Sequence, residues 1–98
     1  MSLSDEKIQQ VWEKGAVDPN NDPKIWRKDQ CGAWMHRVAH GDTARNSTYG
    51  WEIHHVNPNG GDDLSNLIPL QWENNLATAD SGNLVCVVTS EGVKNVKK

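Results

Sequence analysis

The segment GWEIHHVNPNGGDDLSNLIPLQWENN at residues 50–75 decides the fold that this sequence predicts. Residues 51–56 alternate between apolar and polar side chains, which is typical of a half-buried strand, and residues 67–70 form a second short apolar run. A loop rich in glycine, proline and asparagine joins them at residues 57–66. We therefore expect the two strands to pair and residues 71–79 to pack on them as a helix.

Two adjacent histidines near the end of the first strand are the residues most suited to chemistry. Successive side chains of a strand point to opposite faces, so His54 and His55 should have different duties. We expect one to face the helix and bind metal while the other faces substrate. A neutral imidazole is both a good ligand and a good base near pH 7, and hydrolysis of a phosphodiester needs both. An amide oxygen from the helix is a harder ligand that suits a site with positions open for water and phosphate oxygens.

The spacing of these residues resembles the HNH endonucleases, the ββα-metal family of colicin nuclease domains, homing endonucleases and phage nicking enzymes. The family pattern is an Asp-His or His-His pair, an Asn inside the loop, and a His or Asn in the helix. Here these positions are His54 with His55, then Asn66, then Asn75. The similarity is strongest over residues 50–80, and a weaker one to small bacterial and phage members extends upstream.

The resemblance implies an α+β fold with a ββα-metal core, an N-terminal helix and additional short strands, in one domain over residues 1–98. It implies a metal-dependent endonuclease in which His54 and Asn75 bind one divalent ion and His55 is the general base. It also implies that Asn66 hydrogen-bonds across the loop and so fixes the aim of His55. Because Asn75 stands where many members have His, we expect Mg²⁺ or Mn²⁺ ahead of zinc or nickel.

Charge is distributed unevenly along the chain. The net charge of -3 argues, taken alone, against a nucleic-acid partner, and residues 51–83 carry five acids and no Lys or Arg. Residues 24–50 instead hold five Lys and Arg against two Asp. Local rather than net charge sets the attraction for phosphate, so this segment predicts a face that contacts nucleic acid, DNA ahead of RNA. The candidate contacts are Arg27, Lys28, Arg37 and Arg45, and the alternative is a solvated basic surface without a partner.

The remaining segments predict a small core closed by a short helix. Only 36% of the 98 residues are hydrophobic and there is no Phe, so the five Trp must supply most of the large apolar volume. Residues 4–14 predict a helix that Ser4 caps. Weak alternation predicts a strand within residues 31–38, and Val-rich residues 84–89 predict a last strand. We expect residues 91–98 to be a mobile tail.

The two cysteines, Cys31 and Cys86, are too few for a disulfide-dense secreted scaffold. A cytoplasmic protein with reduced thiols, without membrane anchor or signal peptide, is the simpler interpretation. Zinc ligation by Cys31, His36 and His40 is an alternative, although their spacing matches no standard zinc pattern.

Two other functions compete with the nuclease. The first is an HNH-type module that binds nucleic acid with weak or lost catalysis. The second is an assembly partner, for example in a phage packaging complex, that associates with protein through the acidic face. A protein partner could also supply specificity to an active nuclease.

Overall fold

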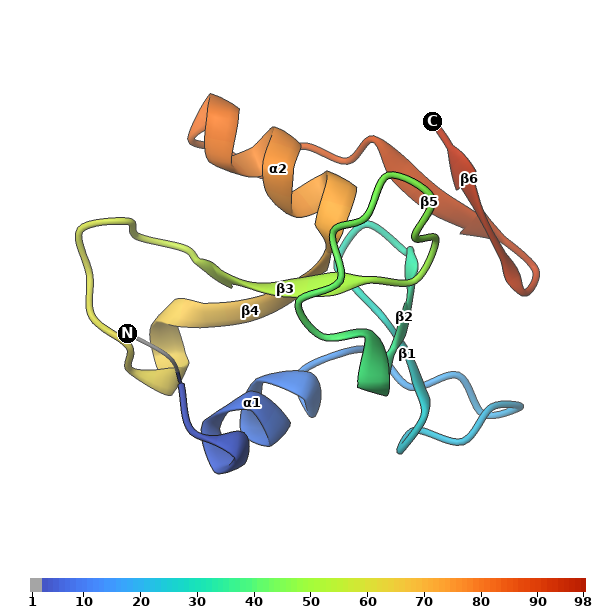
Figure 1. Ribbon diagram of the computed structural model, residues 1–98, viewed down its shortest axis with the longest axis horizontal. Helices are drawn as coiled ribbons and strands as arrows, with labels where there is room; N and C mark the ends of the chain where they lie inside the picture. Colours follow the sequence, from blue (N-terminus) through green and yellow to red (C-terminus); the bar gives the residue numbers. More distant parts are fainter. Residues whose placement is uncertain (1–2) are drawn as a thin grey trace.

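The computed structural model describes residues 3–98, which form an α+β fold with two helices and three two-stranded antiparallel hairpins. Figure 1 shows the hairpin of β3 and β4 in the middle of the molecule, with α2 on one side of it and α1 on the other. No helix in this part of the chain is long and apolar enough to cross a membrane. In chain order the elements are α1 (Asp5–Trp12), β1 (Trp26–Lys28), β2 (Trp34–His36), the 3-10 turn η1 (Arg37–Ala39), β3 (Trp51–His55), the 3-10 turn η2 (Leu64–Asn66), β4 (Leu67–Gln71), α2 (Trp72–Ser81), β5 (Val88–Glu91) and β6 (Lys94–Lys97).

The central hairpin pairs β3 with β4 in the way that the alternating pattern predicts. Trp51 lies opposite Gln71, His54 opposite Ile68, and His55 opposite Leu67. Because side chains alternate along a strand, this register sends neighbouring residues of β3 toward different helices. The predicted pairing of residues 51–56 with 67–70 is therefore confirmed.

Helix α1 closes the underside of the hairpin. The Ser4 side chain accepts a hydrogen bond from the backbone N–H of Lys7, which confirms the predicted cap. Trp12, at the end of the helix, is fully buried and packs on Trp51 with ring centroids 5.2 Å apart. Together with Met35 these two indoles form the centre of the core, so tryptophan does supply its large apolar volume.

Helix α2 begins where β4 ends, without an intervening loop. The Gln71 side chain accepts hydrogen bonds from the backbone N–H groups of Glu73 and Asn74, and so serves as the N-cap. At the other end, Gly82 has φ of 80°, a left-handed conformation that glycine adopts without strain. The helix predicted over residues 71–79 is confirmed, and α2 packs on β3 as expected.

A buried polar cluster joins the β1–β2 turn to the start of α2. Asp29 is only 6% exposed, and its two oxygens accept hydrogen bonds from Cys31 N, Ala33 N, Gln71 N and the Asn74 side chain. Oδ1 of Asn74 in turn accepts hydrogen bonds from the backbone N–H groups of Val87 and Val88, and its Nδ2 donates to the carbonyl of Val88. These contacts fix the direction in which α2 leaves the hairpin.

Three expectations need correction. Strand β1 was not expected, and it forms because Trp26–Lys28 pairs with β2. The expected mobile tail instead contains β6, which pairs with β5. The two cysteines are not reduced thiols but form a disulfide between Cys31 and Cys86, with Cα atoms 5.4 Å apart. A disulfide sulfur is no thiolate ligand, so the zinc alternative through Cys31 is wrong.

Candidate functional site

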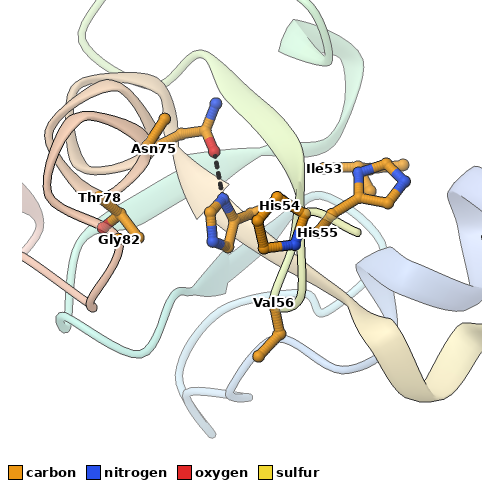
Figure 2. A pocket seen from close by; sticks show the side chains of 9 residues that line it. Ile53, His54, His55, Val56, Asn75, Thr78 and Gly82 are labelled. Atoms are coloured by element: carbon orange, nitrogen blue, oxygen red, sulfur yellow. Dashed lines mark hydrogen bonds between the residues drawn. The ribbon is translucent and has the colours of Figure 1, made fainter. Parts of the chain in front are cut away.

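His54 and Asn75 meet between β3 and α2. His54 points from the strand toward the helix, and its Nδ1 lies 3.1 Å from Oδ1 of Asn75, at the fourth position of α2. Figure 2 shows the two side chains directed at one another across the gap between strand and helix. The structure thus brings together the two residues that were expected to share a metal ion.

A cavity of about 300 Å³ opens beside this pair. Its polar side chains come from His54, Asn75 and Thr78, and much of the rest of its lining is small or apolar. Its volume lies at the lower end of the range for small-ligand sites. The lining residues are Ile53, His54, His55, Val56, Pro58, Asn75, Thr78, Ala79 and Gly82.

The geometry of the pair fits a divalent cation. Two ligands placed at right angles, each roughly 2.1–2.2 Å from one ion, lie about 3 Å apart. Nδ1 of His54 and Oδ1 of Asn75 are hydrogen-bonded at 3.1 Å, a separation that is compatible with this value. Within residues 3–98 there is no group of three or more His, Cys, Asp or Glu side chains suited to holding a metal. An ion here would therefore have two protein ligands and keep its other positions for water and phosphate oxygens.

His55 points to the opposite face of β3, toward α1. Figure 2 shows its ring directed away from that of His54. Nε2 of His55 lies 2.6 Å from Oδ1 of Asp62, and the Asp62 carbonyl accepts a hydrogen bond from Nζ of Lys7. A carboxylate at Nε2 favours the tautomer that carries its proton there, which leaves Nδ1 of His55 with a free lone pair.

Asn66 holds the loop between the two strands. Its Nδ2 donates to the carbonyls of Asn57 and Gly61, and its Oδ1 accepts from the backbone N–H of Asn57. Gly60 packs so closely that a Cβ there would lie 2.7 Å from Nδ2 of Asn66. The Asn66 side chain therefore helps to fix the loop that carries Asp62, and the contact with Asp62 in turn orients the ring of His55.

The four expected phosphate contacts do not form one cluster. Arg27 donates to the carbonyls of three residues of its own chain, and Arg37 donates to the Gln9 side chain. Lys28 has its Nζ 4.7 Å from the centre of the Trp34 ring. Arg45 is exposed and lines a second surface cavity of about 290 Å³. Of the four residues, Arg45 is the one that this structure presents to solvent without a hydrogen bond among the residues described.

Sequence reasoning missed Asp62, which is the residue that contacts His55. Asp62 and Asp63 are adjacent in a glycine-rich loop, and both have the same charge and similar surroundings in the sequence. Only the folded loop brings Asp62 rather than its neighbour to the imidazole. It also missed that Asn74 and Asn75 differ in role, because Asn74 is fully buried in the scaffold whereas Asn75 faces the cavity.

Comparison with protein-family models, curated proteins and solved structures found no match to this chain.

Proposed function

We propose that this protein is a metal-dependent endonuclease of the HNH type that hydrolyses phosphodiester bonds in nucleic acid. One observation carries the proposal: Nδ1 of His54 and Oδ1 of Asn75 lie 3.1 Å apart, across a hairpin and a helix that the sequence pattern places together. This separation supports a shared divalent cation, Mg²⁺ or Mn²⁺ ahead of zinc or nickel, because one ligand is an amide oxygen.

The side chains have distinct duties in this proposal. His54 and Asn75 hold the ion, which when bound supplies a Lewis acid that stabilises charge on the phosphate and on the leaving oxygen. His55 accepts a proton at Nδ1 from the attacking water, while the water oxygen bonds to phosphorus and the bond to the leaving oxygen breaks. Asp62 keeps the other proton of His55 at Nε2, and Asn66 keeps the loop in place.

A second candidate is a nucleic-acid-binding module of the same type with weak catalysis. The orientation of His55 favours it, because this ring and that of His54 leave β3 on opposite faces. A base that acts on water beside the ion needs to come within hydrogen-bond distance of that water. Cleavage would be slow if the end of β3 has to rearrange before His55 can come within hydrogen-bond distance of that water.

Cleavage assays separate the two candidates. Supercoiled plasmid, single-stranded DNA and RNA would each be incubated with the protein and Mg²⁺ or Mn²⁺, and in parallel with EDTA. The nuclease predicts metal-dependent cleavage that EDTA abolishes, whereas the binding module predicts a mobility shift without cleavage. His40→Ala serves as the matched control, since its ring packs on Trp51 away from the cavity and its loss should leave cleavage unchanged. Absence of cleavage with every metal and substrate would contradict the nuclease.

A further inference from the structure

A third cavity, far along β3 from the histidines, has aromatic walls. It measures about 360 Å³ and is lined by Asn21, Trp26, Trp34, Tyr49 and Val93. The Trp26 ring stands almost perpendicular to two others, at 83° to Trp34 and 85° to Tyr49. Trp34 is only 3% exposed, so Trp26 and Tyr49 supply the accessible aromatic surface, and the volume lies in the range of small-ligand sites.

The Trp26 side chain is unlike the other four indoles. The indole N–H groups of the others all donate to backbone carbonyls: Trp12 to Pro23, Trp34 to Gly92, Trp51 to Arg37 and Trp72 to Ser47. Among the residues that the structure describes, the Trp26 indole N–H has no such acceptor. A buried indole N–H normally has a hydrogen-bond acceptor. Because the Trp26 N–H has none, it is left available to the cavity or to solvent.

Two more lining residues carry polar groups that are not used inside the fold. Across residues 3–98, the Tyr49 hydroxyl and the Asn21 side-chain amide make no hydrogen bond, although both residues are half-buried. No polar side-chain atom of the described residues is buried without a partner, so these groups reach solvent. The cavity therefore combines stacking surfaces with donors and acceptors at its edge.

Charges of both signs lie near this cavity, although none lines it. Nζ of Lys28 lies 4.7 Å from the centre of the Trp34 ring. The carbonyl of Asp22 accepts a hydrogen bond from the backbone N–H of Trp26. Charge therefore does not select the ligand. The aromatic surface, together with unused donors and acceptors at the edge of the cavity, favours a flat ring that carries polar groups.

We infer that this aromatic cavity binds an unstacked nucleobase of single-stranded nucleic acid. The base stacks on Trp26, the indole N–H and the Asn21 amide hydrogen-bond to its edge, and Lys28 contacts an adjoining phosphate. Stacking tolerates any base, so the site fixes a strand rather than reads a sequence. The inference concerns binding and does not rest on cleavage at His54.

The two cavities belong to different parts of the molecule. Tyr49 precedes the first residue of β3, and His54 lies near the other end of that strand. In Figure 1 the β5–β6 turn, which contains Val93, lies at the edge of the molecule away from the end of β3 that carries His54. A strand held in the aromatic cavity is thus bound several residues of β3 away from the candidate metal site.

The five indole N–H signals in a ¹H–¹⁵N NMR spectrum test this inference. Thymidine monophosphate, then a fifteen-residue oligothymidylate, would be added to the whole protein in EDTA, with Trp26→Phe used to assign the Trp26 signal. We expect the Trp26 signal to move with both probes, and the Trp12 and Trp72 signals, which are held by carbonyls elsewhere, to stay in place. Inorganic phosphate at equal concentration should leave the Trp26 signal where it is.

Variant affinities provide the second arm. Trp26→Ala should weaken oligothymidylate binding by about 5- to 150-fold, the range for loss of one base–aromatic stack, and Trp26→Phe should lose less. Trp72→Phe is the matched control, because the Trp72 indole donates to Ser47 away from this cavity. Circular dichroism checks that each variant is folded.

Several results would overturn the inference. The Trp26 signal could stay unmoved by oligothymidylate, or move equally with inorganic phosphate. A folded Trp26→Ala protein could bind the oligonucleotide as tightly as the parent. Movement with tetramethylammonium but not with thymidine monophosphate would assign the cavity to a methylated ammonium instead.

Discussion

Asp62 contacts His55 and bears on the tautomer and orientation of the His55 ring. Nε2 of His55 and Oδ1 of Asp62 are 2.6 Å apart, and both side chains are more than a third exposed. The contact is therefore worth little as a stabilising ion pair, and its effect lies in the tautomer and orientation of the ring.

Replacing Asp62 with Asn tests this positioning role. Asp62→Asn keeps the size of the side chain but weakens the preference for a proton at Nε2, so we expect the ¹⁵N shifts of the His55 ring to report a changed tautomer ratio. Cleavage should fall by about tenfold or more while metal affinity stays as in the parent. Asp63→Asn, in the same loop, is the control. Unchanged ring shifts in Asp62→Asn would remove Asp62 from the site.

His40 is the residue for which a pH effect on stability is expected. Burial lowers the pKa of His40 below its ordinary value of 6.5; the nearby Glu52 partly offsets this by raising the pKa, and Arg37 lowers it further. The unfolded chain therefore binds this proton more readily than the folded one. The stability that His40 contributes is present above pH 6.5 and is lost as the pH falls from 6.5 through its folded pKa.

The substitution His40→Gln should reduce this pH dependence. Glutamine has no charge to gain, so the unfolding free energy of the variant should decrease less than that of the parent between about pH 7 and about pH 5. Urea unfolding at several pH values measures both slopes. Equal slopes would mean that His40 does not contribute to acid sensitivity.

At the scale of elements, α2 carries the amide of Asn75, the proposed metal ligand, on a face with room for another side chain. Ala79 lies one helical turn after Asn75, is exposed, and lines the same cavity. Residues four apart on a helix share a face, so a histidine at position 79 would approach an ion held by His54 and Asn75.

We therefore expect Ala79→His to raise zinc affinity by about tenfold or more, equivalent to about 1.4 kcal/mol, by adding a third protein ligand. Isothermal titration calorimetry with Zn²⁺ measures the affinity of the variant and of the parent. Ala77→His is the matched control, because Ala77 lies in a different surface cavity. If both variants bound zinc equally well, the pair of His54 and Asn75 would not be the metal site.

The elements that the sequence predicted are those whose pattern is local. Strand β3 and helix α2 each carry their own periodicity, and the sharp loop at residues 57–66 leaves them little choice of partner. Strand β1 has only three residues, and its pairing depends on β2. Strand β6 has a polar sequence, KNVK, that reads as tail, and its pairing with β5 depends on the short turn at Gly92.

The candidate site, like the fold, was predictable from the sequence only in part. Alternation along β3 was enough to predict that His54 and His55 face different sides, and helix α2 brought Asn75 to one of them. The contact with Asp62 and the burial of Asn74 depend on long-range packing that the sequence pattern does not contain.

For the whole molecule, the disulfide is a long-range covalent link between two parts of the fold. It joins the turn after β1 to the segment before β5 across a separation of 55 residues. Closing a loop of this length restricts the unfolded chain, and a bond of this kind typically adds about 2–4 kcal/mol. In a chain with so small a core, this is a large share of the total stability.

The double variant Cys31→Ser with Cys86→Ser should thus lose about 2–4 kcal/mol of unfolding free energy in urea. The parent treated with dithiothreitol should match the double variant. If dithiothreitol left the unfolding curve of the parent unchanged, the two cysteines would not be joined in solution.

The dependence of cleavage rate on Mn²⁺ concentration, compared between His54→Ala and His55→Ala, tests the central claim most directly. The account predicts that His55→Ala keeps the half-saturating Mn²⁺ concentration of the parent but cleaves about 10²- to 10⁴-fold more slowly, the usual value of a positioned base. His54→Ala should instead need more Mn²⁺ and recover part of its rate when the ion is in excess. A parent that cleaves equally well in EDTA, or a His55→Ala protein that cleaves as fast as the parent, would contradict the account.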